Sequence, residues 1–342
     1  MSTTHPASHT IERDAVIGYG LARAVRAPSV HNTQPWRFQV TGDRIAVRAD
    51  PSRRLAVLDP HGRELVQSVG AALLNLRVGL AARGWDAEIT RLPAPADPDL
   101  LAVVRAVPGD ASPALAALDP VVALRRTNRR RFEPAPLTDS ELRTLAHITA
   151  DEGAALVPVT SEEHRRLVAR LVQRADVEQN ADPAYRAELR QWTGRPKDAR
   201  DGVPAAAVAR VDRTPVGDLP LRDFDTRSRA ALPAETGSSA DQPLILLTTP
   251  GDEPIDWLRS GEALQRLLLE LTRHGYVAGP MTQPIEVPLT RSQLRSALSW
   301  GAHPQMLLRV GRAAPTPATP RRGVADVSRG GLAPADLPES EG

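Results

Sequence analysis

Apolar residues recur at helical spacing in several stretches of the chain and form short alternating or continuous runs in others. The helical spacing predicts helices over residues 11–26, 65–83, 161–176 and 261–274. A further helix begins at a capping box formed by Thr138 and Glu141. The short runs predict strands near residues 37–40, 45–49, 88–92, 101–107, 244–248 and 306–310. The pattern therefore predicts a fold that mixes helices with strands.

The end of the helix over residues 65–83 resembles the end of the helix over residues 261–274. The first is followed by Gly84 and Trp85, and the second by Gly275 and Tyr276. This match predicts a diverged internal repeat, with a first half over residues 1–117 and a second half over residues 118–342. Residues 180–242 have no counterpart in the first half, and their scattered aromatic residues favour a packed flap. Residues 328–342 are expected to form a flexible tail.

Composition narrows the possible chemistry. Apolar residues make up 41% and charged residues 25% of the 342, which is typical of a soluble globular protein. The chain has no cysteine, and its eight histidines are scattered, so a thiolate nucleophile and a zinc site are not expected. A formal charge of +2 does not by itself indicate a nucleic-acid or membrane partner. Neither a signal peptide nor a membrane span is predicted, and we expect a cytoplasmic protein.

Residues 27–38 are the most distinctive stretch of the chain. Pro28 and Pro35 lack a backbone donor and restrict the residue before them, which predicts a stiff loop. The residues between these prolines include five hydrogen-bonding side chains and no Lys, Asp or Glu: Ser29, His31, Asn32, Thr33 and Gln34. Such a loop suits an uncharged ligand with a polar edge.

This loop closely resembles the Ala-Pro-Ser-x-x-Asn-x-Gln-Pro-Trp signature of the nitroreductase superfamily of FMN enzymes, in particular its Acg-like branch. The resemblance implies an α+β nitroreductase-like fold. It also implies that Pro28, Ser29 and Asn32 contact a flavin. Acg-like proteins have a lid over the flavin, and residues 180–242 are expected to form one here.

Three stretches of the second half resemble the remaining flavin-binding parts of that family. Arg126-x-Asn128-x-Arg130-x-Phe132 resembles the motif that holds the FMN phosphate and the pyrimidine edge of the ring, and guanidinium groups suit both tasks. The other two are the loop against the flavin N5 and the terminal basic motif, which correspond to Pro280, Met281, Thr282 and Gln283 and to Arg321 and Arg322. Without the resemblance, the arginine run also fits a solvated face or a nucleic-acid site, and the loop fits a plain turn.

The two halves have lost complementary parts of this set. The first half keeps the Pro-Ser-x-x-Asn loop but lacks the arginine motif, whereas the second half keeps the arginines and lacks a second loop. In the family, a homodimer builds each flavin site from both subunits. The resemblance therefore implies a monomer that acts as a pseudo-dimer, with a single flavin site where the halves meet.

The resemblance implies a two-electron oxidoreductase. NADPH or NADH would reduce FMN, and a small acceptor such as a nitroaromatic or a quinone would then take the electrons. His31 is a candidate proton donor to the acceptor, because it lies in the signature loop. The alternative function is a lidded protein that sequesters or stores FMN with little or no turnover.

Overall fold

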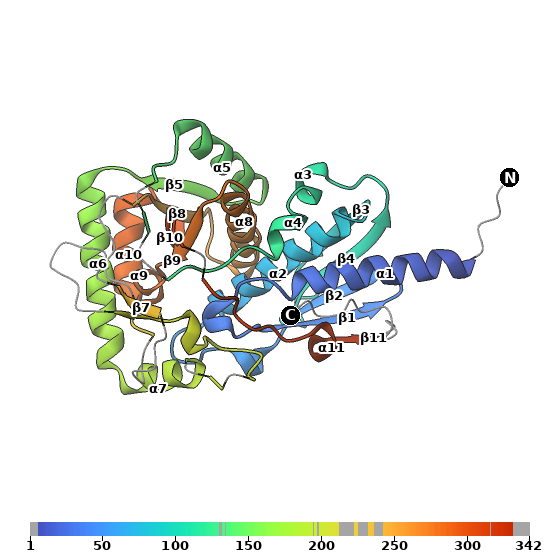
Figure 1. Cartoon of the computed structure of the whole chain (residues 1–342), viewed down its shortest axis with the longest axis horizontal. Coiled ribbons are helices and arrows are strands. Elements are labelled where there is room, and N and C mark those ends of the chain that lie inside the picture. Colours follow the sequence, from blue (N-terminus) through green and yellow to red (C-terminus); the bar gives the residue numbers. More distant parts are fainter. Residues whose placement is uncertain are drawn as a thin grey trace.

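The computed structural model describes residues 6–129, 132–133, 135–193, 195–196, 198–211, 222–224, 232–235, 242–314 and 316–330. It contains two larger sheets, one in each half, and two long helices that pass between them (Figure 1). The expected mixture of helices and strands is confirmed.

The first sheet carries the predicted hairpin. Trp36, Phe38 and Val40 alternate with exposed residues along its first strand, so one face is buried against the core. Gly42 adopts a φ of 62° in the turn, a conformation that favours glycine. The elements of this half are α1 (Pro6–Ala24), η1 (Val30–Asn32), β1 (Trp36–Thr41), β2 (Arg44–Ala49), η2 (Pro51–Arg53), α2 (Arg63–Ala81), β3 (Trp85–Arg91), β4 (Leu100–Pro108) and α3 (Pro113–Ala116).

The two central strands of the second sheet are buried on both faces. Strand β8 (Leu244–Thr249) has no exposed residue, in accord with its continuous apolar run. The capping box of Thr138 and Glu141 is present at the start of α5. The remaining elements are α4 (Asp119–Val122), α5 (Asp139–Asp151), β5 (Ala155–Val159), α6 (Glu162–Ala181), α7 (Pro183–Trp192), η3 (Ala205–Ala207), β6 (Ala209–Val211), β7 (Leu232–Glu235), α8 (Pro254–Arg273), β9 (Val277–Pro280), α9 (Gln283–Glu286), α10 (Pro288–Leu298), β10 (His303–Gly311), α11 (Val324–Val327) and β11 (Ser328–Gly330).

The two sheets share one strand order. The first runs β11-β1-β2-β4-β3 and the second β5-β8-β10-β9, so apart from the edge strand β11 the third and fourth strands exchange places in both. Each sheet also has its long helix between the second and third strands, α2 in one and α8 in the other. Gly84 and Gly275, which follow these helices, have φ values of 76° and 75°. The internal repeat remains a prediction, and this shared order supports it.

Helices α2 and α8 cross in direct backbone contact (Figure 1). A Cβ atom at Gly70 would overlap the carbonyl oxygen of Leu258, and one at Gly261 would overlap the carbonyl oxygen of Gln67. A buried hydrogen bond of 2.7 Å from Gln265 Nε2 to Asn75 Oδ1 joins the same helices. The absence of side chains at the two glycines thus sets how closely the halves approach.

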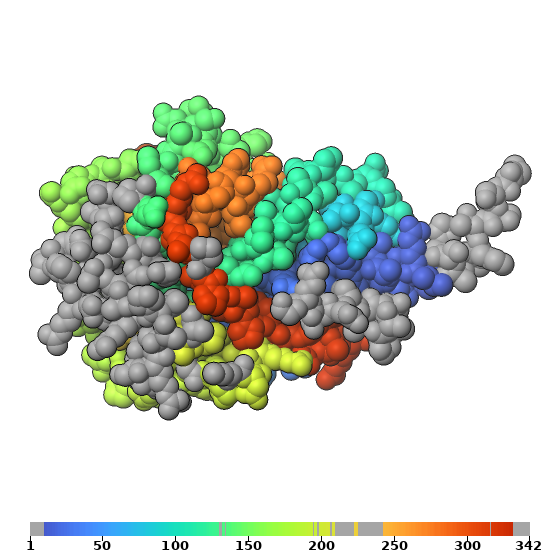
Figure 2. Space-filling view, viewed as in Figure 1, coloured from blue at the N-terminus to red at the C-terminus, as the bar shows by residue number. Residues whose placement is uncertain are grey.

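The C-terminal arm, residues 316–330, returns to the first half. Strand β11 pairs in parallel with β1 at the edge of the first sheet. Figure 2 shows the arm as a band along one face of the molecule, from the second half toward the N-terminal part. The predicted tail over residues 328–342 is therefore wrong at its start, because Ser328–Gly330 is strand. Residues 331–342 lie outside the described residues.

The insertion over residues 180–242 is only partly described, and its start differs from the prediction. Helix α6 continues to Ala181, and α7 follows at once with Tyr185, Leu189 and Trp192 buried. The first residues of the insertion therefore have a helical pattern of apolar residues, which the prediction of a segment without periodicity missed. Within the described residues, no helix is both long and apolar enough to cross a membrane.

We expect Gly70→Ala and Gly261→Ala each to lower the free energy of unfolding by about 1–3 kcal/mol or more, because a Cβ would force the helices apart. The sign of this change shows whether a clash is present, since Gly→Ala in a helix without a steric clash raises the free energy of unfolding by about 0.5–1 kcal/mol. Urea titration followed by far-ultraviolet circular dichroism measures both effects. Unchanged or raised stability would show that the helices do not meet at these glycines.

Candidate functional site

The loop of residues 27–38 is held in an unusual backbone conformation. His31, Asn32 and Gln34 have φ values of 46°, 57° and 51°, in the left-handed region that non-glycine residues rarely adopt. Ser29 fixes the turn by accepting a hydrogen bond of 2.9 Å from the Gln34 backbone. Such strain costs of order 1–3 kcal/mol per residue and clusters at functional sites.

Asn32 and Gln34 connect this loop to two distant segments. Asn32 Nδ2 donates to the carbonyl oxygens of Gly202 and Pro320, at 2.9 and 3.0 Å. Gln34 Nε2 donates to the carbonyl oxygen of Arg200, and Gln34 Oε1 accepts from the Arg322 backbone at 2.7 Å. The amide of Asn32, expected at a flavin, is thus directed to the insertion and the C-terminal arm.

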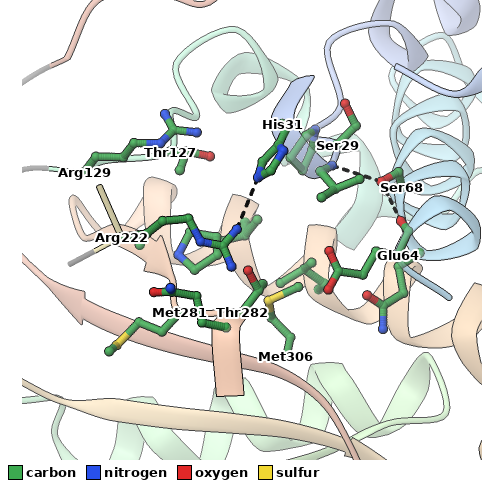
Figure 3. Close-up of a pocket in the computed structure, with 18 of the residues that line it drawn as sticks. Ser29, His31, Glu64, Ser68, Thr127, Arg129, Arg222, Met281, Thr282 and Met306 are labelled. Carbon is green, nitrogen blue, oxygen red and sulfur yellow. Dashed lines mark hydrogen bonds between the residues drawn. The ribbon is translucent and has the colours of Figure 1, made fainter. Parts of the chain in front are cut away.

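A cavity of about 1080 Å³, including the space at its open mouth, lies where the two halves meet. It is bounded by the signature loop, by α2 and α8 and by the loop that follows β9 (Figure 3). Of the predicted site residues, it is lined by Pro28, Ser29, His31, Asn128, Pro280, Met281, Thr282 and Gln283. The structure therefore brings the signature loop of the first half and the predicted N5 loop of the second half to one cavity.

Four predicted residues do not line it: Asn32, Arg126, Arg321 and Arg322. Arg322 donates to the carbonyl oxygens of Gln34 and Asp326. Arg130 lies outside the described residues.

The loop after β9 has one backbone donor that is already used. Met281 N–H donates to the carbonyl oxygen of Leu307 at 2.8 Å. A backbone donor from this loop to a ligand must therefore come from another residue. Gly279 precedes the loop without a side chain because a Cβ there would meet Asn128 O at 2.9 Å and Arg309 Nε at 2.8 Å.

The arginine run lies along the end of the second sheet, and its described residues differ in what they contact. Thr127 forms a bridge with Ala278, and Arg129 lines the cavity next to it. Arg125 is 4% exposed, whereas Arg126 bonds back to the carbonyl oxygens of Ala123 and Arg125. Thr127, Asn128 and Arg129 thus line the cavity, Asn128 as predicted, and Arg125 is buried beside them, whereas Arg126 does not line it.

Arg125, Arg129 and Arg321 gather without a neutralising carboxylate among the described residues. Burial, followed by the charges of Arg126 and Arg129, lowers the pKa of Arg125 to about 10. Burial and then Arg222 lower the pKa of Arg129 to about 10, and burial with four neighbouring arginines lowers that of Arg321 to about 9. Among the described residues, Nε and Nη1 of Arg125, Nη1 of Arg129 and Nε of Arg321 are buried without a hydrogen-bond partner, while Arg321 Nη1 donates to Thr319 and Pro320. This cluster is built to receive an anion.

A second charged group faces the cavity close to Arg129. Arg222, from the insertion, forms an ion pair with Glu286, and its Nη1 lies 3.1 Å from His31 Nε2 (Figure 3). Burial, then the charge of Arg222, lowers the pKa of His31 to about 3. His31 is therefore neutral at pH 7, which argues against the predicted role as proton donor.

Several cavity residues were missed in the sequence. Glu64, Gln67, Ser68 and Ala71 lie on one face of α2, a helix that had been treated only as core. Their spacing of i, i+3, i+4 and i+7 is a polar stripe on an apolar helix, which was a usable signal. Arg222 gave no signal, and Phe224 was one of the aromatic residues that favoured a packed flap without pointing to the cavity. The described residues contain no group of His, Asp and Glu that could hold a metal ion.

We expect His31→Asn to reduce the acid sensitivity of the cofactor-free protein. Below pH 6.5 the histidine of the unfolded chain is protonated, whereas the buried ring in the folded protein stays neutral down to about pH 3. The free energy of unfolding of wild type therefore falls by up to about 1.4 kcal/mol for each pH unit between pH 6.5 and pH 3. Asparagine tolerates the positive φ and does not titrate. The measurement is urea unfolding at several pH values, with the exposed His147→Asn as control. Equal pH dependence in wild type and His31→Asn would contradict the buried neutral ring.

Comparison with known proteins gives close relatives over nearly the whole chain. The chain is 36% identical over 319 residues to the Mycobacterium tuberculosis protein named "Putative NAD(P)H nitroreductase Rv3131", covering 90% of this chain and 89% of that protein. It is 33% identical over 323 residues to "Putative NAD(P)H nitroreductase acg" of the same organism, covering 91% and 95%. No protein-family model matches the chain.

Among solved structures, the FMN-dependent nitroreductase NfnB of Mycobacterium smegmatis, in complex with NADPH, matches 64% of this chain and 99% of its own. Its sequence identity is 18% and its TM-score 0.38, so the family assignment depends on the sequence relatives. Because relatives above 30% identity cover about nine-tenths of the chain, this protein belongs to the nitroreductase family, in its Acg-like branch.

Proposed function

We propose that this chain binds one FMN in the cavity between its halves and acts as an oxidoreductase. NADPH or NADH would be the electron donor, and a small nitroaromatic or quinone-like molecule the acceptor. The relative named above as an NAD(P)H nitroreductase and the FMN-dependent NfnB support the choice of cofactor and donor. When bound, FMN supplies the two-electron chemistry, and the protein supplies position and electrostatics.

The observation that carries this proposal is the uncompensated arginine cluster beside a ligand-sized cavity. Arg129 lines the cavity, and its charge acts on both Arg125 and Arg321. Burying guanidinium groups without partners is costly, and an anion that accepts from their free nitrogens removes that cost. The phosphate of FMN is such an anion.

The rest of the cavity fits a flat heterocycle. Val172, Leu264, Leu268, Met281 and Met306 give it an apolar lining, while Ser29, Thr282 and Gln283 offer polar groups for a ring edge. A cavity of 300–1000 Å³ with few polar groups is typical of a cofactor site. We therefore assign the ring to the cavity and the phosphate to the cluster.

This placement uses segments from both halves, as proposed for a fused pseudo-dimer. Pro28 and Ser29 come from the first half, Thr127 and Arg129 from the second, and Arg321 from the C-terminal arm. Arg222 and Phe224 come from the insertion, which we propose acts as a lid. A single chain would thus complete one site as a monomer.

One observation favours the alternative of FMN storage. The described part of the insertion is tied down, because Arg222 pairs with Glu286 and Gly202 exchanges hydrogen bonds with Asn32. A lid that stays closed would hold FMN and exclude a nicotinamide.

Substitutions in the arginine run test which of its arginines bind the phosphate. We expect Arg125→Met or Arg129→Met to weaken FMN binding about 10- to 150-fold, because hydrogen bonds to charged groups contribute about 1.5–3 kcal/mol each. Arg126→Met is the matched control and should change affinity less, since its guanidinium bonds to backbone carbonyls. Quenching of flavin fluorescence on titration measures all three. A larger loss of FMN affinity in Arg126→Met would favour Arg126, as the sequence predicts, as the phosphate ligand. Unchanged affinity in all three variants would contradict the phosphate site.

The visible spectrum of the purified protein tests the proposed function directly. We expect a flavin spectrum with about one FMN per chain that bleaches under anaerobic NADPH or NADH. Bleaching only with dithionite would favour storage. A colourless protein that cannot be reconstituted with FMN would contradict both functions.

A further inference from the structure

Glu64 is a buried carboxyl group at the cavity that FMN binding does not explain. It lies in the first turn of α2, is 4% exposed and lines the cavity with Gln67 and Ser68. In Figure 3, Glu64, Ser68 and Ser29 lie on the side of the pocket opposite to Arg129 and Thr127. A phosphate in the arginine cluster would not use it.

The charges around Glu64 leave it without an adequate counter-ion. Glu286, the second buried carboxyl, takes the cation that is available, since its Oε2 accepts from both Arg222 and Gln179. Arg63 donates to Glu64 Oε1 at the long distance of 3.3 Å and divides its donors with the carbonyl oxygens of Pro304 and Ile285. Glu64 thus lies near an ionised Glu286, and its counter-ion is the guanidinium of Arg63, which also donates to two carbonyl oxygens.

The helix terminus does not compensate for this. The first turn of a helix favours a negative charge, but here Asp59 accepts the backbone N–H of Leu65 at 2.8 Å and those of Arg63 and Glu64. Burial, then the charge of Glu286, raises the pKa of Glu64 well above its ordinary value, while Arg63 and Arg222 oppose the rise and Asp59 adds to it. Burial raises the pKa of Glu286 too, but the charge of Arg222 and hydrogen bonds from Arg222, Thr282 and Gln179 outweigh it and lower this pKa below its ordinary value. Two carboxyls whose pKa values are driven apart are typical of an acid and its ionised partner.

We propose that Glu64 is a neutral carboxylic acid at pH 7 and donates the proton that a quinone-like acceptor needs on two-electron reduction. This inference rests on the proposed function. The acceptor receives two electrons and one hydrogen nucleus as hydride from the reduced flavin, and a proton from Glu64. The O–H bond of Glu64 breaks, an O–H bond forms on the acceptor oxygen, and water returns a proton to the carboxylate. Because Oε1 already accepts from Arg63, Oε2 is the oxygen that carries the proton.

Nearby groups are poorer proton donors. The pKa of His31 is lowered to about 3, so its ring is neutral and its Nε2 faces the Arg222 guanidinium. Glu286 is ionised, and Arg222 is held by it. Of the carboxyls Glu64, Glu286 and Asp59, only Glu64 lines the cavity, and its pKa is raised.

Two measurements on Glu64→Gln test the inference. The first is infrared spectroscopy of the cofactor-free and FMN-loaded protein, where the band of a protonated carboxyl at pH 7 should be present in wild type and absent in the variant. The second compares acceptors in the loaded protein. Quinone reduction should fall about 100-fold or more, as expected for loss of a general acid. Ferricyanide, which takes single electrons without a proton, should react at the wild-type rate, and Glu64→Asp should restore part of the quinone rate.

The exposed Glu88→Gln is the matched control and should change neither measurement. Glutamine has the size and neutrality of protonated glutamate, so Glu64→Gln should fold, which its FMN content verifies. Absence of the infrared band from wild type, or wild-type quinone reduction in Glu64→Gln, would overturn the inference while leaving the proposed function intact. Failure of wild type to bind FMN would instead overturn the proposed function, and the donor role with it.

Discussion

The crossing of α2 and α8 at Gly70 and Gly261 is the constraint on which the rest of the structure depends. Helices that carry side chains at their contact stay about 8–10 Å apart, whereas here each backbone meets the other directly. Cavity residues lie within two turns of the crossing on both helices, Glu64 and Gln67 on α2 and Leu264 and Leu268 on α8. The distance between the helices therefore sets the width of the cavity.

The signature loop depends on contacts from far along the chain. Its three positive φ values carry a cost of several kcal/mol in total, which local hydrogen bonds alone would offset only in part. The amides of Asn32 and Gln34 bond to residues 200–202 and 320–322, so the insertion and the C-terminal arm hold the loop in place. The side-chain amides of Asn32 and Gln34 thus join the loop to the insertion and to the C-terminal arm.

The elements of the fold were largely predictable because hydrophobic periodicity and caps are local. The hairpin, α2, the capped start of α5 and β8 all appear where the sequence indicates them. The arm was not predictable as strand, since Ser328–Gly330 is short and polar and gains its structure only by pairing with β1. An edge strand of this kind leaves no periodic pattern.

The candidate site was predictable in part, because short motifs indicate some of its residues. The loop and residues 280–283 were placed at the cavity by local motifs alone. In the arginine motif, Asn128 is buried and lines the cavity as predicted, whereas Arg126 bonds to backbone carbonyls. Arg125, which is buried, and Arg129, which lines the cavity, were not predicted as site residues. In a run of arginines, the residue type does not indicate which side chains face the cavity. Contacts with other elements of the fold determine it.

The charges around the cavity are arranged in two sets with different consequences. In one set, Arg125, Arg129 and Arg321 keep buried nitrogens without a hydrogen-bond partner among the described residues, which suits an anion that enters and stays. In the other, Arg222 and Glu286 neutralise each other and leave Glu64 neutral beside them. A protein that only holds FMN needs the first set. The second set buries three ionisable groups at a desolvation cost, and cofactor binding gives no reason for it. A carboxyl kept protonated beside the same cavity is useful where a bound molecule is to be protonated, and on this ground the structure favours turnover over storage.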